Sequence, residues 1–136
     1  MFQYLPKDNK QLKNDFLRRK RALKNKFLGF EDYKYWYHSQ EKKCAYCEIS
    51  EVDCQKIVVS GLLKSSRFPQ NGKTYRGKAR GMWLEVDRIN PRDKFYHKEN
   101  CVLACYFCNN DKSDVFSYEQ YKNFKENRLN FLKSLL

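Results

Sequence analysis

Apolar residues recur at helical spacing near the start of the chain. Four of them are separated by four, seven and four positions: Leu12, Phe16, Leu23 and Phe27. This spacing places them on one face of a helix, which the pattern predicts over residues 8 or 9 to 28. The opposite face is basic, and such a face fits contact with a phosphate backbone and a solvated surface equally well.

Shorter patterns predict the remaining elements. Gly29 can end the first helix, and residues 55–64 are apolar with a periodicity that fits either a helix or a strand. A capping-box pattern at Ser117 predicts the start of a closing helix. The other predicted elements are a helix over residues 30–40, strands over 85–87 and 100–104, and the closing helix itself over 117–136.

The composition predicts a folded, basic domain. Of the 136 residues, 41% are hydrophobic and 16% aromatic, which argues against disorder despite a mean hydropathy of -0.91. The length fits a single domain. The 28 Lys and Arg against 16 Asp and Glu leave a net charge of +12. Such a charge is typical of proteins that bind a polyanion, although charge alone specifies no partner.

The sequence carries no pattern of a membrane or export segment. Its start has no apolar h-region, and no run approaches the roughly 18 apolar residues that a membrane span needs. We therefore expect a cytoplasmic protein with no membrane partner. In that reducing compartment, the six cysteines are better explained by metal binding than by disulfides.

Two Cys-x-x-Cys pairs dominate the cysteine pattern. Cys44 and Cys47 form the first pair, and Cys105 and Cys108 form the second in the other half of the chain. Alone, the first pair fits a redox site as well as half of a zinc site. Together, the pairs predict a closed four-thiolate zinc site that is structural rather than catalytic. Its metal would contribute directly to folding.

Two further cysteines lie outside these pairs. Cys101 belongs to an apolar segment, Cys-Val-Leu-Ala, so we expect it to be buried as a small hydrophobic residue. The pattern assigns no role to Cys54.

Residues 65–80 differ in composition from their surroundings. The segment holds two glycines, one proline and five basic residues among a few aromatic ones, which predicts a long basic loop or loose hairpin. Such a loop suits contact with nucleic-acid phosphates. The residues expected to make these contacts are Arg67, Lys73, Arg76, Lys78 and Arg80.

Polar residues at fixed spacing follow this loop. They are Glu85-Val-Asp87-Arg88-Ile, then Tyr96, and then Asn100-x-Val-Leu-Ala-Cys105-x-x-Cys108-Asn109-x-x-Lys112. With the preceding cysteine pair, the segment 43–116 resembles the zinc-knuckle branch of the HNH nucleases. The resemblance implies an α+β fold, namely a small, mostly helical domain (1–136) around a zinc-stapled ββα-metal core. Basic helices at 1–42 would precede that core, and the helix at 117–136 would follow it.

The resemblance also implies site residues. Asp87 and Asn109 match the two protein ligands of the catalytic divalent cation, which would be Mg²⁺ or Mn²⁺. Asn100 matches the asparagine that braces the loop between the two strands by hydrogen bonds to the backbone. Lys112, one turn after Asn109, would lie near the phosphates.

Arg88 departs from the family pattern, because the family usually has a water-activating histidine there. An arginine cannot act as a base at neutral pH. A sub-branch of rare-cutting restriction enzymes carries the same Asp-Arg pair and uses a tyrosine in the following loop. By this resemblance Tyr96, one residue later than in that sub-branch, is the candidate base and Arg88 a phosphate clamp. His97 is the alternative, since an imidazole pKa of about 6.5 suits base chemistry better than a phenol pKa of about 10.

The function implied by the resemblance is metal-dependent hydrolysis of phosphodiester bonds in DNA. The alternative is a catalytically inactive, zinc-bound nucleic-acid-binding module, in which Asp87 pairs with Arg88 or Lys112 and Asn109 only caps a helix. One metal site cuts one strand, so a double-strand break would need a homodimer. RNA stays open as a substrate, and so does the context, whether restriction, phage, mobile element or defence.

Overall fold

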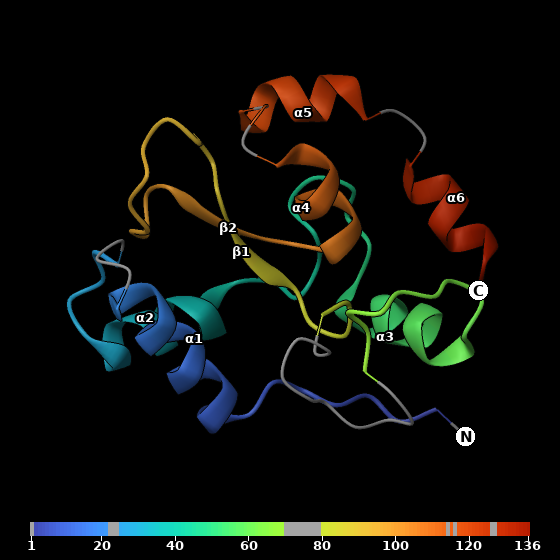
Figure 1. Ribbon diagram of the computed structural model, residues 1–136, viewed down its shortest axis with the longest axis horizontal. Helices are drawn as coiled ribbons and strands as arrows, with labels where there is room; N and C mark the ends of the chain where they lie inside the picture. Colours follow the sequence, from blue (N-terminus) through green and yellow to red (C-terminus); the bar gives the residue numbers. More distant parts are fainter. Residues whose placement is uncertain (1, 22–24, 70–79, 114, 116, 126–127) are drawn as a thin grey trace.

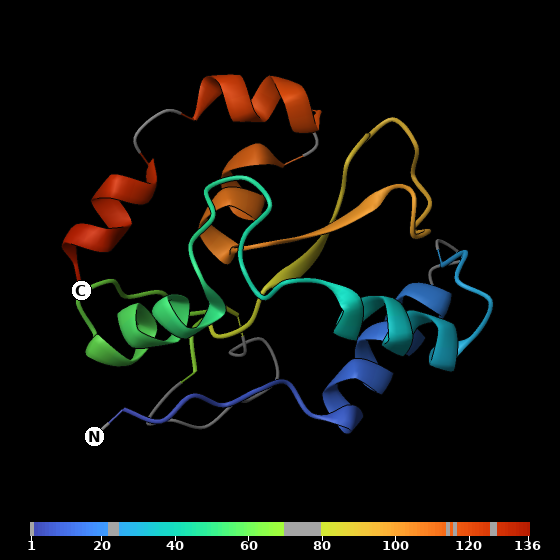
Figure 2. The same cartoon turned by 180° about the vertical axis from the view of Figure 1, so that it is seen from behind.

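A computed structural model describes residues 2–21, 25–69, 80–113, 115, 117–125 and 128–136. A two-stranded hairpin lies at the centre, with α1 and α2 on one side of it and α3 on the other (Figures 1 and 2). The elements are α1 (Asn9–Arg21), α2 (Phe30–Ser39), α3 (Glu51–Ser60), β1 (Glu85–Arg88), β2 (Cys101–Ala104), α4 (Tyr106–Lys112), α5 (Tyr118–Phe124) and α6 (Arg128–Ser134). The predicted α+β class, with mostly helices around a small sheet, is confirmed.

The hairpin and α4 form the unit on which the polar residues are placed. Strand β1 pairs antiparallel with β2, so that Glu85 lies opposite Ala104 and Arg88 opposite Cys101. Helix α4 follows β2 directly and packs on β1. Because side chains alternate along a strand, Glu85 and Asp87 share one face. Their contacts, described below, show that this face is the one covered by α4.

Helices α1 and α2 are joined by aromatic side chains. The rings of Phe27 and Tyr33 lie edge to face at 5.2 Å between centroids, and Phe16 lies 5.9 Å from Tyr33. Offset and edge-to-face pairs of this kind add stability beyond the area they bury. The N-terminal helices therefore carry a core of their own against the hairpin.

The first helix is shorter than predicted. Helix α1 ends at Arg21, and the chain at Lys26 instead runs beside the hairpin loop, where its N–H donates to the Tyr96 carbonyl at 2.7 Å. Phe27 still packs in the core, although it lies outside α1. An apolar residue at helical spacing is therefore not part of the helix here. The predicted inward residue Leu23 lies outside the described residues.

Gly29 opens the second helix rather than closing the first. It is the N-cap of α2 in an extended conformation. The helix predicted over 30–40 is confirmed by α2. Of the ambiguous apolar segment 55–64, the part up to Ser60 is helical as the end of α3, which Ser50 caps, and Gly61 ends that helix at φ 74.

The closing helix was predicted as one element, and this is wrong. The capping box at Ser117 is confirmed, but α5 ends at Phe124 and a second helix, α6, begins at Arg128. Tyr121 and Leu132 are both buried, so the break allows both helices to contribute to the core. In the described part of the chain, no helix has the length and apolar character that crossing a membrane requires.

Gly81, just before β1, gives a test of this packing. Its φ is +95, and a Cβ there would lie 2.8 Å from Phe68 Cε1 and 3.1 Å from Val58 Cγ2. We expect Gly81→Ala to lower the free energy of unfolding by about 2 to 4 kcal/mol, from backbone strain and overpacking together. Urea denaturation measures this change.

The matched control is Gly61→Ala. Gly61 also has positive φ, at +74, but has open space around it, so strain alone should cost about 1 kcal/mol. Equal losses in the two variants would contradict the close approach of Phe68 to Gly81.

Candidate functional site

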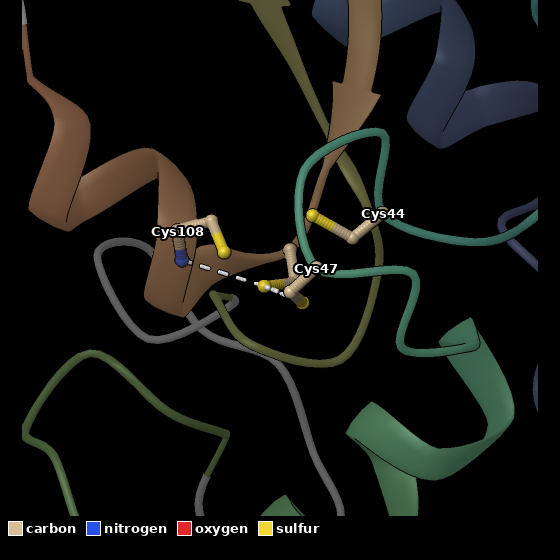
Figure 3. Close-up of side chains that lie close together, drawn as sticks. Cys44, Cys47 and Cys108 are labelled. Atoms are coloured by element: carbon tan, nitrogen blue, oxygen red, sulfur yellow. Dashed lines mark hydrogen bonds between the residues drawn. The ribbon is translucent and has the colours of Figure 1, made fainter. Parts of the chain in front are cut away.

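The four paired cysteines come together. Cys44 and Cys47 lie in the loop before α3, whereas Cys105 and Cys108 lie at the start of α4. Their sulfur atoms are all within 4.8 Å of one another, and those of Cys47 and Cys105 are 3.8 Å apart. Figure 3 shows the sulfur atoms of Cys44, Cys47 and Cys108 turned toward one another. Four thiolates around a tetrahedral zinc ion, with bonds of about 2.3 Å, would be about 3.8 Å apart.

The chemistry of the cluster fits a metal. All four side chains are at most 2% exposed. Hydrogen bonds from the neighbouring thiols, that of Cys105 first, lower the pKa of Cys44, whereas the bond with Cys108 raises the pKa of Cys105. Four thiolates so close together and so buried would repel one another without a cation. The cluster can therefore hold a thiolate-binding metal such as zinc.

The other two cysteines are also buried. Cys101 is in β2, as predicted, and burial raises the pKa of its thiol to about 12. Cys54, which the sequence left without a role, lies on α3, and its thiol adds to the effect of Cys108, Cys44 and Cys47 in raising the pKa of Cys105. It therefore packs beside the cluster.

Asp87 is held by two side chains that approach one of its oxygens. The hydroxyl of Tyr46 donates to Asp87 Oδ2, and Lys112 Nζ lies 3.2 Å from the same atom. Burial, followed by the bond to Asp87, raises the pKa of Tyr46, so this tyrosine stays a neutral donor. Asp87 is 8% exposed and sits where the loop that carries Cys44 and Cys47 meets the hairpin.

Lys112 takes a different place from the one expected. It is fully buried, and its ammonium group also donates to the Arg88 carbonyl at 3.1 Å. The last turn of α4 lies over the end of β1, so the lysine pairs with Asp87 instead of reaching solvent. Because Lys112 is buried, the geometry does not support direct contact between its ammonium group and a phosphate.

Asn109 lies one turn before Lys112 on α4 and contacts Glu85. Its Nδ2 donates to Glu85 Oε1 at 2.9 Å. Glu85 also accepts two hydrogen bonds from Arg80, from Nε at 2.9 Å and from Nη2 at 2.6 Å. Since Glu85 and Asp87 share a strand face, Asn109 and Asp87 flank the same part of the sheet.

Of the five residues predicted to contact nucleic acid, two lie in the described part of the chain, Arg67 and Arg80. Arg67 is exposed. Arg80 is paired with Glu85 and its guanidinium lies 4.6 Å from the ring centroid of Tyr106. The predicted contacts at Lys73, Arg76 and Lys78 lie outside the described residues.

Asn100 binds the backbone of the loop between the strands. Its Oδ1 accepts from the Asn90 N–H at 2.9 Å, and its Nδ2 lies within 3.4 Å of three carbonyl oxygens, those of Asn90, Asp93 and Phe95. The side chain is 5% exposed. These bonds fix the loop that carries the two candidate bases.

Tyr96 belongs to the loop between β1 and β2 and contacts the N-terminal part of the chain. The guanidinium carbon of Arg88 is 5.5 Å from its ring centroid, and that of Arg19, in α1, is 4.9 Å away. Its carbonyl accepts the Lys26 N–H at 2.7 Å. Both the backbone and the ring of Tyr96 are thus held by residues from another part of the chain.

His97 is held by two carboxylates. Its Nε2 lies 2.9 Å from Asp93 Oδ2 and its Nδ1 3.1 Å from Glu99 Oε2. These carboxylates, that of Asp93 first, raise the pKa of His97. Both ring nitrogens of His97 are thus engaged by carboxylates.

Two of these residues were missed by reasoning from the sequence. Tyr46 stands between the cysteines of a metal-binding pair, a position at which the spacing gives no sign of a second contact. Arg19 lies three positions after Phe16 and seven after Leu12, on the face predicted to be apolar, where the pattern gave no sign of a site residue. Both act across distances of more than 40 residues along the chain, which no local pattern marks.

Together, the antiparallel hairpin, the helix packed on it and the adjoining four-cysteine cluster form an HNH (ββα-metal) fold. Among solved structures, the chain is similar to that of the rare-cutting HNH restriction endonuclease PacI, with a TM-score of 0.62 and 23% sequence identity. The likeness covers 88% of this chain and 74% of PacI. No family model and no curated protein matches the sequence.

The buried pair of Lys112 and Asp87 allows a test of the site's construction. Lys112→Met would leave a buried carboxylate without its counter-charge, so we expect the free energy of unfolding to fall by about 3 to 5 kcal/mol. Adding Asp87→Asn should recover part of this loss. Denaturant titrations of the two single variants and the double variant measure the coupling.

Lys98→Met is the control, because Lys98 is exposed and its loss should change stability by no more than about 0.5 kcal/mol. A Lys112→Met variant as stable as Lys98→Met would show that the ion pair does not hold Asp87.

Proposed function

We propose that this protein is a metal-dependent endonuclease of the HNH type that hydrolyses phosphodiester bonds in DNA. The observation that carries the proposal is that Asp87 and the Asn109 partner Glu85 lie on one face of β1, under α4, with Arg88 at the adjoining strand end. The likeness to an HNH restriction endonuclease and the net charge of +12 support it, since a basic protein gains affinity for DNA through counterion release.

Asp87 and Asn109 would hold the catalytic divalent cation, Mg²⁺ or Mn²⁺. Both described contacts of Asp87 fall on Oδ2, which leaves Oδ1 as a ligand. Asn109 uses its amide N–H on Glu85, which leaves the amide oxygen. Oxygen ligands of this kind, together with water, suit a hard octahedral ion. When bound, the ion would stabilise charge on the phosphate and on the leaving 3′ oxygen.

Tyr96 is the base in this proposal. His97 is the weaker candidate, because both of its ring nitrogens are engaged by carboxylates. The Tyr96 oxygen would orient a water molecule or, as a phenolate that has given its own proton to solvent, would accept a proton from it. The water oxygen would bond to phosphorus as the bond to the 3′ oxygen breaks. Asn100 would keep the loop in place through its bond to the Phe95 carbonyl.

Arg88 would clamp the phosphate. Within the described part of the chain its guanidinium forms no ion pair with a carboxylate, so its charge is available to an anion. Lys112 would act indirectly, by fixing Asp87 together with Tyr46. This division of roles matches the chemistry of arginine, whose planar group binds two phosphate oxygens at once.

The four-cysteine cluster would hold a structural zinc ion. Cys44, Cys47, Cys105 and Cys108 would be thiolates in that state. Tyr46 and Asn109 each stand directly next to one of these ligands in the sequence. The zinc ion would therefore set the positions of a side chain that holds Asp87 and of the second ligand of the catalytic cation.

A non-catalytic nucleic-acid-binding module is the second candidate. The ion pair between Lys112 and Asp87 favours it, because the pair neutralises the carboxylate that the cation needs. The two candidates share the basic surface, so both predict DNA binding that weakens steeply with salt. They differ only in cleavage.

The basic segment 65–80 would contact the DNA backbone, with Arg67 exposed at its start. Each chain would cut one strand. A double-strand break would thus require two copies on a palindromic site, and RNA is a further substrate to compare.

The test is a supercoiled-plasmid assay with Mg²⁺ or Mn²⁺. We expect the wild type to nick or linearise the plasmid, and Asn109→Ala to slow this by about 100-fold or more because a metal ligand is lost. Asn110→Ala is the matched control, since this neighbouring asparagine is exposed and should leave the rate within about twofold. DNA binding, measured in Ca²⁺, should be alike in all three proteins.

Tyr96→Phe and His97→Ala identify the base. We expect Tyr96→Phe to slow cleavage by about 100-fold, to a residual rate that single-turnover assays still measure, and His97→Ala to retain the wild-type rate. The reverse result would assign the role to His97. Folded, zinc-loaded wild type that binds duplex DNA, single-stranded DNA and RNA without cutting any of them would favour the binding module instead.

A further inference from the structure

Arg19 belongs to α1, outside the β1–β2–α4 unit, yet it contacts the candidate base. Its guanidinium carbon lies 4.9 Å from the centre of the Tyr96 ring. Its Nη1 donates to the Asp15 carbonyl at 3.1 Å, which holds the group in place. Its Nε is buried without a hydrogen-bond partner among the described residues. The Arg19 side chain is therefore held against the Tyr96 ring.

The charge of Arg19 is not neutralised by the nearest carboxylate. Asp15 forms ion pairs with Lys7 at 2.7 Å and with Arg18 at 2.9 Å, whereas Arg19 contacts only the Asp15 backbone oxygen. Arg88 lies against the same tyrosine ring at 5.5 Å. Two guanidinium groups thus share one aromatic ring, and both are within the distance of about 6 Å at which cation–π attraction is significant.

Like charges placed together repel unless negative charge lies near them. A tyrosine can take a proton from water only as a phenolate, whose negative charge lies on the oxygen attached to the ring that the two cations contact. The backbone supports the same arrangement, because the segment after α1 pairs with the loop at Tyr96 through the Asn25 bridge and the Lys26 N–H.

We propose that Arg19 is a positioning residue for Tyr96. It holds the ring beside Arg88 and stabilises the phenolate form of Tyr96, which is the form that can accept a proton from water. This inference rests on the proposed function, with Tyr96 as base. It makes the N-terminal helix a part of the cleavage site, in addition to any contact it makes with DNA.

The test compares Arg19→Gln, Arg19→Lys and Arg18→Gln in single-turnover cleavage, with DNA affinity measured separately in Ca²⁺. Arg18 is the matched control, because it is the preceding arginine and its side chain is 65% exposed. We expect Arg19→Gln to slow cleavage about tenfold, Arg19→Lys to restore most of the rate, and Arg18→Gln to stay within about twofold. Affinity should be equal in the three variants.

A double-mutant cycle separates action through Tyr96 from a general effect. In a Tyr96→Phe background the further loss from Arg19→Gln should shrink to less than about twofold, because the group it assists is gone. The proposal is overturned if the full loss persists there, if Arg18→Gln slows cleavage equally, or if affinity falls in parallel with the rate.

The contact itself can be measured without activity. The NMR signals of the Tyr96 ring, assigned by their loss in Tyr96→Phe, should shift in Arg19→Gln and not in Arg18→Gln. Unchanged ring signals in Arg19→Gln would overturn the proposal even if cleavage fell. A wild type that cuts no substrate would remove the proposed function, while shifted ring signals would still show the contact.

Discussion

The convergence of four buried cysteines is the constraint on which the rest of the structure depends. Their sulfur atoms lie within 4.8 Å of one another, although the two pairs come from opposite halves of the chain. Thiolates at this distance, shielded from water, need a cation between them. The cluster fixes the loop before α3 against the start of α4. It thereby brings Tyr46 to Asp87 and turns the next residues of α4 toward β1.

The polar site contains two charge groups on one strand face, a buried one at Asp87 and a half-buried one at Glu85. Asp87 is held by Lys112 and Tyr46, and Glu85 by Arg80 and Asn109. Removing Lys112 would leave the buried Asp87 carboxylate without its counter-charge, which costs several kcal/mol. Asp87 and Glu85 are each paired with a cation. The excess positive charge of the protein therefore lies on other residues, among them Arg88 and Arg19. A polyanion would therefore meet uncompensated cations around a carboxylate whose second oxygen is free for a metal.

Much of this arrangement could be predicted from the sequence, because its signals are local or spaced. The cysteine pairs, the two strands around the Asn100 loop and the helix α2 all carry such patterns. The end of α1 could not be predicted, since Phe27 keeps helical spacing while it reaches the core from an extended segment. The burial of Lys112 could not be predicted either, because a lysine on a helix is expected to be exposed unless the strand under the helix is known. Contacts such as Tyr46 with Asp87 depend on the tertiary fold alone.

In the proposed function, a metal ion held by the four clustered cysteines organises the polar site. The most direct measurement combines metal analysis with the amide NMR spectrum of the protein during chelation. The account predicts one zinc ion per chain, which is lost in Cys47→Ser but retained in Cys101→Ala. It also predicts that chelation collapses the dispersed signals of β1, β2 and α4. A folded protein without zinc, or a spectrum that chelation leaves unchanged, would contradict the account.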